Sequence, residues 1–320
     1  MYFKKGFRTG LISLAMVLVF AGFACAETIE FVVPWSAGGG SDTMARFLVK
    51  SIRDNKLTDA DFVVANKPGG NGQIGSAYVV NKKGRDNVWM TLSSGQISVP
   101  LAGLGKIKAT DFTALAQIAG DVNLLVVSKD SPFKSVADVA KAAKANPGKL
   151  NVGGSATAAE DHICTYLLGK ATGTKMNYTA FSGGGEVMSN LLGGHIDVAW
   201  ANPNECIGQV KGGLARMLAV TTEDRLALLP DVPSFKELGY NMVFWQVRGV
   251  HGPPNMSKES IAWSVDLLKK ATETDTWQKE YLTGKVLTSR FIPGADYTKV
   301  IKENEEMFRE ALGSMGLLKE

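Results

Sequence analysis

The sequence predicts an α/β protein built from two lobes that are joined by a hinge. Short apolar runs, typical of buried strands, alternate with amphipathic stretches, typical of helices, along nearly the whole chain. The pattern of residues 27–125 recurs in residues 126–243 with a similar size but without sequence similarity. Because apolar strands that alternate with helices form sheets covered on both faces, we expect a parallel sheet in each lobe.

Residues 1–26 have the pattern of a secretory signal peptide. Three basic residues precede a short apolar run, residues 11–23, and Ala24-Cys25-Ala26 forms a small-residue cleavage site. The apolar run is too short to span a membrane. A lipoprotein is an alternative because of Cys25, although the bulky Phe23 is a poor context for lipidation. We expect cleavage near Ala26 and a periplasmic mature protein.

The composition, with 45% hydrophobic and 21% charged residues among 320, is that of a soluble globular protein. The formal net charge is +4, but three of the 35 basic residues and none of the 31 acidic residues lie in the signal peptide. The mature chain is therefore almost neutral. It has no basic block interleaved with aromatic residues, which argues against nucleic acid as a partner.

The two cysteines that remain after cleavage are Cys164 and Cys206. An oxidising compartment would allow them to form a disulfide, and two separate buried thiols are the alternative that we favour. Spacing alone does not decide between the two, because a disulfide requires close Cα atoms.

The first block opens with a buried strand, residues 29–33, followed by the glycine-rich loop Pro34 to Asp42 and a helix to residue 55. A strand at 88–92 ends in the small polar turn Ser93-Ser94-Gly95. The other elements expected in this block are strands at 62–65 and 112–118 and a short helix at 74–81.

A strand expected at 124–128 leads into the second block, residues 126–243, which repeats this alternation. The expected strands are 124–128, 150–153, 177–181, 195–200 and 214–220, and the expected helices are 135–146, 158–168, 186–192 and one that opens after Ala201-Asn202-Pro203-Asn204. Residues 243–250 then form a strand that returns to the first lobe, where helices at 257–272 and 295–312 pack. The predicted lobes are therefore 27–125 plus 244–320, and 126–243. Two crossings between lobes predict a hinge that closes on a ligand.

Four small-residue loops lie between a predicted strand and a predicted helix, at residues 34–42, 66–75, 152–157 and 181–186. Glycines let backbone N–H groups approach a ligand, and the first turn of a helix leaves N–H groups unpaired. Such a helix N-terminus favours negative charge. An ordinary turn with Ser41 or Asp42 as N-cap is the alternative for the first loop. Four such loops together predict a small anionic ligand at the carboxyl ends of the strands.

The motifs of common enzymes are missing from the chain. There is no Gly-x-Ser-x-Gly elbow, no phosphate loop and no metal-ligand spacing among the histidines. His162 lies close to a loop and could contact a ligand, but a structural role in its helix is favoured. Asp42 and Asp197 could form a catalytic carboxylate pair, although Asp42 equally suits bracing of its loop.

Glu160 and Asp161 are expected in the first turn of a helix, where the helix dipole favours acidic residues. We expect both side chains to face solvent. If one of them pointed into the cleft, it would repel an anion and attract an amine.

An ordered set of motifs resembles the solute receptors of tripartite tricarboxylate transporters, also called TctC or Bug proteins. The motifs cover essentially the whole mature chain, although each one alone is weak. They are Pro34, Gly38, Gly39 and Asp42; Asn66-Lys67-Pro68-Gly69 with Gly72 and Gly75; Gly154-Ser155 and His162; 191–197; 218–222 with Arg225; 229–240; and 245–254. The chain departs from the family pattern at residues 158–161, which contain more acid, and at 200–203.

This resemblance implies a type II periplasmic-binding-protein fold whose two lobes close on a small carboxylate. It also implies a monomeric receptor without cofactor or metal, and a large and a small membrane permease subunit as partners. The residues that would bind one ligand carboxylate are Ser36, Gly39, Ser41, Asp42, Gly72 and Gln73, with Trp35, Gly40, Asn71 and Ser94 as neighbouring candidates. The opposite lobe would offer Ser155, Ala156, Thr157, Phe181, Ser182 and Gly183, with Asp197 behind or beside them.

The function expected from these observations is a periplasmic receptor that delivers a di- or tricarboxylate, or a related organic acid, to its transporter. A receptor that signals through a sensor domain is one alternative. An exported enzyme of the same fold is another.

Overall fold

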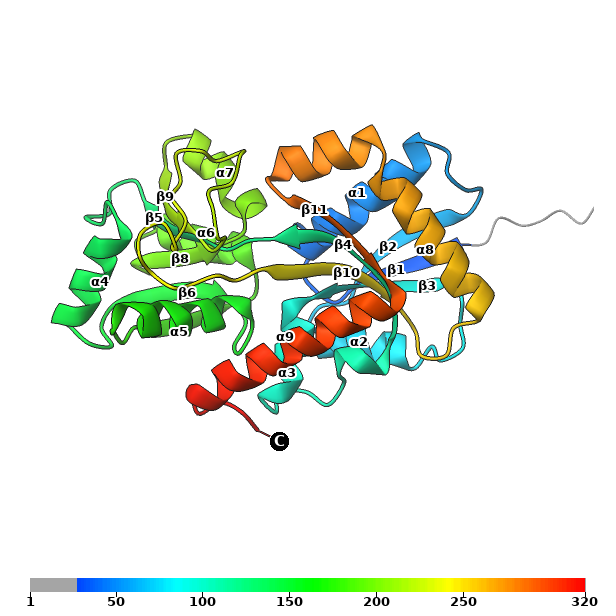
Figure 1. Ribbon diagram of the computed structural model, residues 1–320, viewed down its shortest axis with the longest axis horizontal. Helices are drawn as coiled ribbons and strands as arrows, with labels where there is room; N and C mark the ends of the chain where they lie inside the picture. The colour runs from blue at the N-terminus through cyan, green and yellow to red at the C-terminus, as the bar shows by residue number, and fades with distance from the viewer. Residues whose placement is uncertain (1–27, 320) are drawn as a thin grey trace, which may run out of the picture.

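The computed structural model describes residues 28–319 of the chain. The predicted signal peptide, residues 1–26, and its cleavage site lie outside the described residues. No helix among those described is long and apolar enough to cross a membrane. The chain forms two α/β lobes side by side, as Figure 1 shows.

The first lobe is built on a six-stranded sheet with the strand order β11-β4-β10-β3-β1-β2. Its strands are β1 (Thr28–Val33), β2 (Asp61–Asn66), β3 (Val88–Ser93), β4 (Thr113–Asp121), β10 (Gln246–Gly252) and β11 (Thr288–Pro293). Its helices are α1 (Gly40–Asp54), α2 (Gln73–Val80), α3 (Ser94–Leu101), α8 (Lys258–Thr272) and α9 (Gly294–Ser314), with short helical turns η1 (Gly70–Gly72) and η2 (Ala109–Asp111) and the π-helix η3 (Thr276–Thr283). The buried centre of this lobe is aromatic, because Trp89 packs edge-on against Phe31.

The second lobe has a five-stranded sheet with the order β7-β6-β8-β5-β9. Its strands are β5 (Leu124–Ser128), β6 (Asn151–Ser155), β7 (Asn177–Phe181), β8 (Val198–Ala201) and β9 (Ala215–Val220). Its helices are α4 (Val136–Ala145), α5 (Glu160–Thr172), α6 (Gly184–Leu192) and α7 (Pro203–Lys211). The lobe boundaries given above stay a prediction. The strands of each sheet fall within one predicted lobe, except that β5 begins two residues before the predicted boundary at residue 126.

The expectation that both sheets are parallel is wrong for β5 and β10, which are next to the crossings, and for the edge strand β11. In the first sheet β10 runs antiparallel to β3 and β4, and β11 runs antiparallel to β4. In the second sheet β5 runs antiparallel to β8 and β9. The physical reason is that β5 and β10 each follow a crossing from the other lobe, so the chain enters the sheet from the opposite end.

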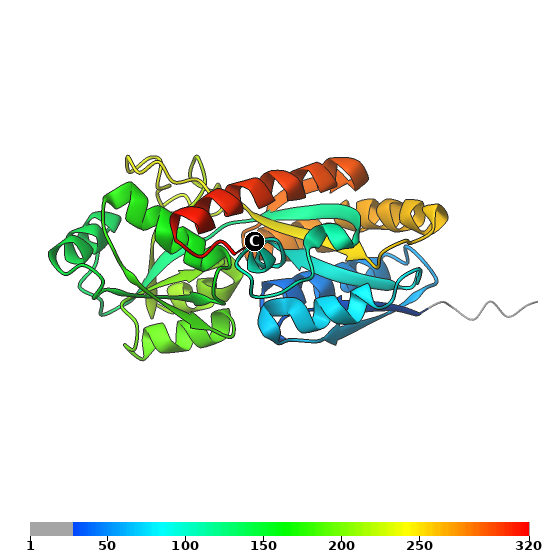
Figure 2. The same cartoon turned by 90° about the horizontal axis from the view of Figure 1, so that it is seen from below.

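The two crossing segments are hydrogen-bonded to each other at the hinge. Asn123 N donates to Thr221 Oγ1, and Thr221 N donates to Asn123 O. Thr221 also accepts from Phe244 N through its carbonyl oxygen. Helix α9 makes a further connection, because it packs on α3 and β4 of the first lobe and also reaches α5 of the second (Figure 2).

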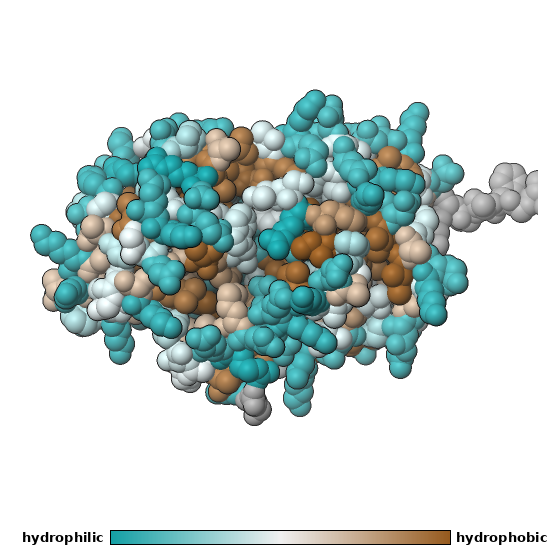
Figure 3. Space-filling model, viewed as in Figure 1, coloured by the Kyte–Doolittle hydropathy of each residue, from teal (hydrophilic) through white to brown (hydrophobic). Residues whose placement is uncertain are grey.

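Apart from the short helical turns η1 and η2, the elements not anticipated from the sequence are α3, η3 and β11. The turn expected at 93–95 is instead the start of α3, where the Ser93 and Gln96 side chains form a capping box. The strand expected at 195–200 begins only at Val198. On the face shown in Figure 3, hydrophilic residues cover the outer helices, and apolar residues are exposed between them near the middle of the molecule.

Candidate functional site

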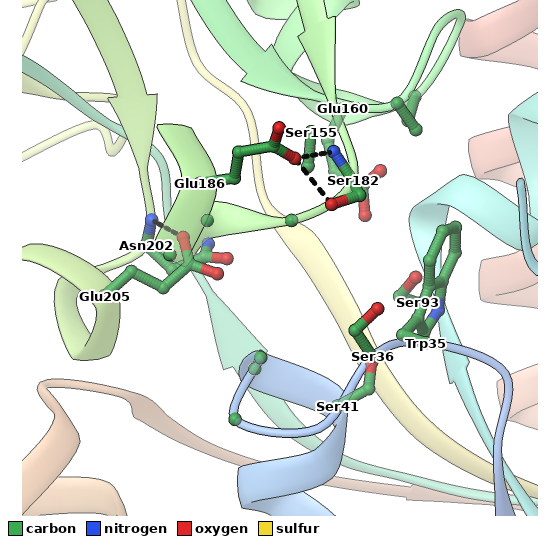
Figure 4. Close-up of a pocket in the computed structure, with 18 of the residues that line it drawn as sticks. Trp35, Ser36, Ser41, Ser93, Ser155, Glu160, Ser182, Glu186, Asn202 and Glu205 are labelled. Carbon is green, nitrogen blue, oxygen red and sulfur yellow. Dashed lines mark hydrogen bonds between the residues drawn. The ribbon is translucent and has the colours of Figure 1, made fainter. Parts of the chain in front are cut away.

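A cavity of about 300 Å³ lies between the two lobes, at the carboxyl ends of β1, β3, β6 and β7. This is the position at which open α/β sheets bind ligands. The labelled side chains converge on it from both lobes in Figure 4. The first lobe contributes Trp35, Ser36, Ala37, Gly38, Gly39, Gly40, Ser41 and Ser93; the second contributes Ser155, Ala156, Ala159, Glu160, Ser182, Gly183, Gly184, Gly185, Glu186, Asn202 and Glu205; and β10 contributes Gln246 and Arg248.

The N-terminus of α1 faces the cavity without a side-chain cap. Gly39 is its N-cap residue, in an extended conformation at φ −75° and ψ 174°, and no side chain accepts from the first turn. The N–H groups of this turn have no partner within the helix and therefore offer donors to a ligand. Gly39 and Ser41, two of the residues expected here, line the cavity.

Asp42 braces the first loop and does not line the cavity. Its carboxylate accepts from Gly38 N at 2.9 Å, from Arg46 Nε at 2.9 Å and from Asn66 Nδ2 at 2.9 Å. Burial raises the pKa of Asp42, but these hydrogen bonds together lower it below its usual value. These contacts are the loop bracing stated as the alternative for Asp42, and its role in ligand binding stays a prediction.

The loop before α6 in the second lobe offers a comparable group of donors. Gly183 is the N-cap residue of α6, again without a side-chain cap. The exposed Glu186 holds the preceding turn, because its carboxylate accepts from Ser182 N at 2.9 Å and from Ser182 Oγ at 2.6 Å (Figure 4). The Glu186 side chain is satisfied within its own loop. The first turn of α6 lines the cavity, with the Glu205 carboxyl group against Gly184.

His162 has the structural role that was favoured for it. Its Nδ1 accepts from Ala158 N at 3.2 Å, and its ring stacks on Tyr178 at 4.2 Å between centroids. Ala156 and Ala158 have left-handed φ angles of 56° and 60°, which L-residues rarely adopt. The Tyr178 hydroxyl donates to Ala156 O at 2.8 Å and helps to hold this strained turn.

Arg248 is the basic residue that lines the cavity, and it is ion-paired. Its Nε donates to Asp121 Oδ2 at 2.8 Å, and its Nη2 donates to Asp121 and to Asn202 Oδ1, the latter at 3.0 Å. Burial would lower the pKa of Arg248, but Asp121 keeps it above its usual value. Asn202 Nδ2 in turn donates to Gln246 Oε1 at 2.9 Å, so a polar network connects the lobes at the base of the cavity.

The expectation that Glu160 and Asp161 face solvent is wrong, since they are 4% and 7% exposed. Glu160 lines the cavity, and Gln246 Nε2 donates to its Oε1. Asp161 lies beneath the loop, where it accepts from Ser155 N at 2.7 Å and from Asn123 Nδ2 at 2.6 Å. The chain turns at the strained residues before α5, and this turn directs the first turn of the helix inwards.

Three residues expected in the second loop lie outside the cavity lining, namely Asn71, Gly72 and Gln73. Gln73 Oε1 accepts from Ile107 N at 3.0 Å, so this side chain fixes a neighbouring loop. A Cβ atom on Gly72 would be 3.2 Å from the Trp35 ring, so Gly72 backs that ring.

Four other expected residues also lie outside the lining: Ser94, Thr157, Phe181 and Asp197. The Ser94 hydroxyl accepts from Val247 N at 3.0 Å. Asp197 lies at the opposite end of β6, where its carboxylate accepts from Asn151 N at 2.8 Å. Asp197 therefore cannot stand beside the second-lobe loops or pair with Asp42.

The cavity is also lined by polar residues that were not predicted from the sequence to bind a ligand. They are Ser93, Glu186, Asn202, Glu205, Gln246 and Arg248. A signal for Arg248 existed, because one charged residue within the apolar run 243–250 needs a buried partner. Cys164 and Cys206 are both buried and free, which confirms the favoured alternative of separate thiols.

Comparisons with known proteins agree with this architecture. Residues 44–317 match the family model described as "Tripartite tricarboxylate transporter family receptor". Protein BugT of Bordetella pertussis is 31% identical over 222 residues, which are 67% of each chain. The periplasmic binding protein BugD superposes with a TM-score of 0.83 at 23% identity and covers 92% of this chain and 99% of its own. An R. palustris protein solved with adipate gives a TM-score of 0.85 at 23% identity, covering 92% and 98%.

Proposed function

Because the chain belongs to the tripartite tricarboxylate transporter receptor family, we propose that it captures a small carboxylate between its lobes and delivers it to the membrane subunits of such a transporter. The family resemblance inferred from the sequence is thereby confirmed. We place the receptor in the periplasm, as a monomer without a cofactor, next to one large and one small permease subunit. No chemical change of the ligand belongs to this function.

The observation that carries this proposal is the pairing of two uncapped helix N-termini across one cavity. The first turns of α1 and α6 both face it, and they belong to different lobes. Each N-terminus favours negative charge, so a ligand with carboxylate oxygens would contact both lobes at once. Contacts with both lobes stabilise the closed arrangement, which is how a ligand shifts a hinge equilibrium.

The ligand class of a solved relative supports the proposal at the level of chemistry. The R. palustris protein of similar fold was solved with adipate, a dicarboxylate. A cavity of about 300 Å³ is at the lower end of the range for small-molecule sites. We therefore expect a ligand with few carbon atoms.

The first experiment is to purify the mature protein, residues 27–320, and to identify by native mass spectrometry any small molecule released on denaturation. Calorimetric titration with a panel of small carboxylates follows, on protein freed of ligand. Binding of unchanged acids supports the receptor function. Turnover of a bound acid would favour an enzyme instead.

Gly39→Val tests the position of the site. A Cβ on Gly39 meets only Ser36 O at 3.5 Å, so the fold accepts the side chain, while its methyl groups obstruct the N–H groups of α1. We expect at least a 10-fold loss of affinity. Gly208→Val, in an exposed turn of α7 with open space around the glycine, is the matched control. Equal affinities of the two variants would place the ligand elsewhere.

A further inference from the structure

Glu160 is a buried carboxylate in the wall of the ligand cavity. It is the first residue of α5, and its side chain reaches from the second lobe towards the first. Its Oε2 lies 3.1 Å from the position that a Cβ on Gly95 would occupy, and Trp35 Cζ2 lies 3.2 Å from the same position. The carboxylate and the Trp35 ring therefore both border Gly95, in the first turn of α3.

This carboxylate has no basic partner among residues 28–319. The ion pairs of the described residues include none with Glu160. Its protein hydrogen bond comes from the neutral amide of Gln246. Arg248, the basic residue in the lining, is held by Asp121. A buried ionised carboxylate that lacks a cation is costly, so a positive group supplied by a ligand would be bound strongly there.

Two further carboxyl groups, those of Glu205 and Asp161, lie near Glu160. Glu205 lines the cavity and accepts from Asn202 N at 3.0 Å. Asp161 lies behind the loop, and burial together with the charges of Glu160 and Glu205 raises its pKa to about 7. The negative charges of Glu160 and Glu205 therefore oppose ionisation of Asp161. A cation in the cavity would relieve this repulsion.

Aromatic and acidic groups side by side suit a protonated amine in particular. An ammonium group can donate to the Glu160 carboxylate and also contact the face of an indole ring. Glu186 does not offer this environment, because it is exposed and its carboxylate is already used by Ser182. The cavity therefore has donors for an anion at the N-termini of α1 and α6 and an acceptor for a cation at Glu160.

We propose that the physiological ligand is a small carboxylate that also bears a protonated amine, and that Glu160 binds this amine and selects against acids that lack it. This inference rests on the proposed function, because it concerns the same cavity and the same receptor role. An amine-free dicarboxylate would place a second negative group near Glu160 and would be repelled.

The test compares acids in matched pairs that differ by one amino group: succinate with aspartate, and glutarate with glutamate. Each is titrated calorimetrically into ligand-free wild-type protein and into the Glu160→Gln variant at pH 7. We expect the wild type to bind the amino member of at least one pair 10-fold more tightly or better. We expect E160Q to weaken that binding by about 10- to 100-fold, which corresponds to the loss of one charged hydrogen bond.

The amine-free acids should respond in the opposite direction, since E160Q removes a repulsive charge. Their affinity should be unchanged or higher in the variant. Glu303→Gln makes the same chemical change on α9, away from the cavity. This control should change the affinity neither for the amino acids nor for the amine-free acids. If E160Q does not fold, the affinities of the wild type for the two members of each pair test by themselves whether the ligand bears an amine.

Two negative results have different meanings. If the wild type binds succinate or glutarate as tightly as the amino partner, the amine assignment is wrong and the carboxylate receptor stands. If no acid of the panel binds, the proposed function itself is overturned.

Discussion

Gly40→Ala should destabilise the protein, because a methyl group at this position would occupy the space of the Arg248 guanidinium. A Cβ built on Gly40 lies 2.8 Å from Arg248 Cζ, 3.0 Å from Nη1 and overlaps Nη2. Arg248 cannot move into solvent, since it is only 3% exposed and is held by Asp121 and Asn202. The start of α1 and the buried ion pair therefore require glycine here.

The size of the effect follows from the hydrogen bonds that must change. Displacing the guanidinium breaks the Nη2 bonds to Asp121 and Asn202, while the Nε bond to Asp121 can persist. A hydrogen bond to a charged group contributes about 1.5–3 kcal/mol, and alanine in place of a helical glycine recovers up to about 1 kcal/mol. We expect a net loss of about 2–5 kcal/mol in the free energy of unfolding, the lower part of which lies in the range found for overpacked cores.

Urea denaturation of the ligand-free mature protein measures this loss. Gly39→Ala is the matched control, because its Cβ would make one ordinary contact of 3.5 Å with Ser36 O. Equal free energies of unfolding for Gly39→Ala and Gly40→Ala would refute the reasoning.

Two further predictions concern pH. Asp42→Asn should lower the free energy of unfolding by about 1–3 kcal/mol at pH 7, because the bonds to Gly38, Arg46 and Asn66 become weaker. The pKa of Asp42 is lower in the folded than in the unfolded state, so the difference from wild type should shrink as the pH falls below about 4. A difference that stays constant with pH in urea denaturation would contradict this. Burial lowers the pKa of His251 to about 3, and neither ring nitrogen has a partner. Wild-type stability should therefore fall as the pH decreases below about 6.5, by about 2 kcal/mol at pH 5, and His251→Leu should flatten this slope in thermal unfolding; equal slopes would count against the argument.

Much of the fold follows from local patterns that need no tertiary information. The apolar runs at β1, β3 and β5 are long enough to be recognised as buried strands, and the glycine loops identify where strands end. Elements with mixed composition were missed: α3 contains Ser98 and Pro100, and β11 is largely exposed. Their conformation depends on what packs on them, as in the hydrogen bond from Val247 N of β10 to Ser94 Oγ at the start of α3.

The glycine loops of the site were also recognisable, because glycines followed by a helix start are a local pattern. Ser36, Gly39, Ser41, Ser155, Ser182 and Gly183 are predicted residues that line the cavity. Gln73, Ser94 and Asp197 are polar residues near loops that the fold uses for other contacts. Residue type alone could not separate the residues that line the cavity from the residues that form contacts elsewhere in the fold.

What the sequence determined by itself was the alternation of strands and helices, the loops with free N–H groups and the family. These depend on periodicity and residue type within short segments. Only the tertiary structure decided the charge of the cavity, because Glu160 was expected in solvent and Arg248 was not considered. The physical reason is that the turn at Ala156 and Ala158 sets the direction of α5, and the return of β10 through the hinge brings Arg248 to Asp121, 127 residues away in the chain. Both are consequences of long-range packing, which no local pattern contains.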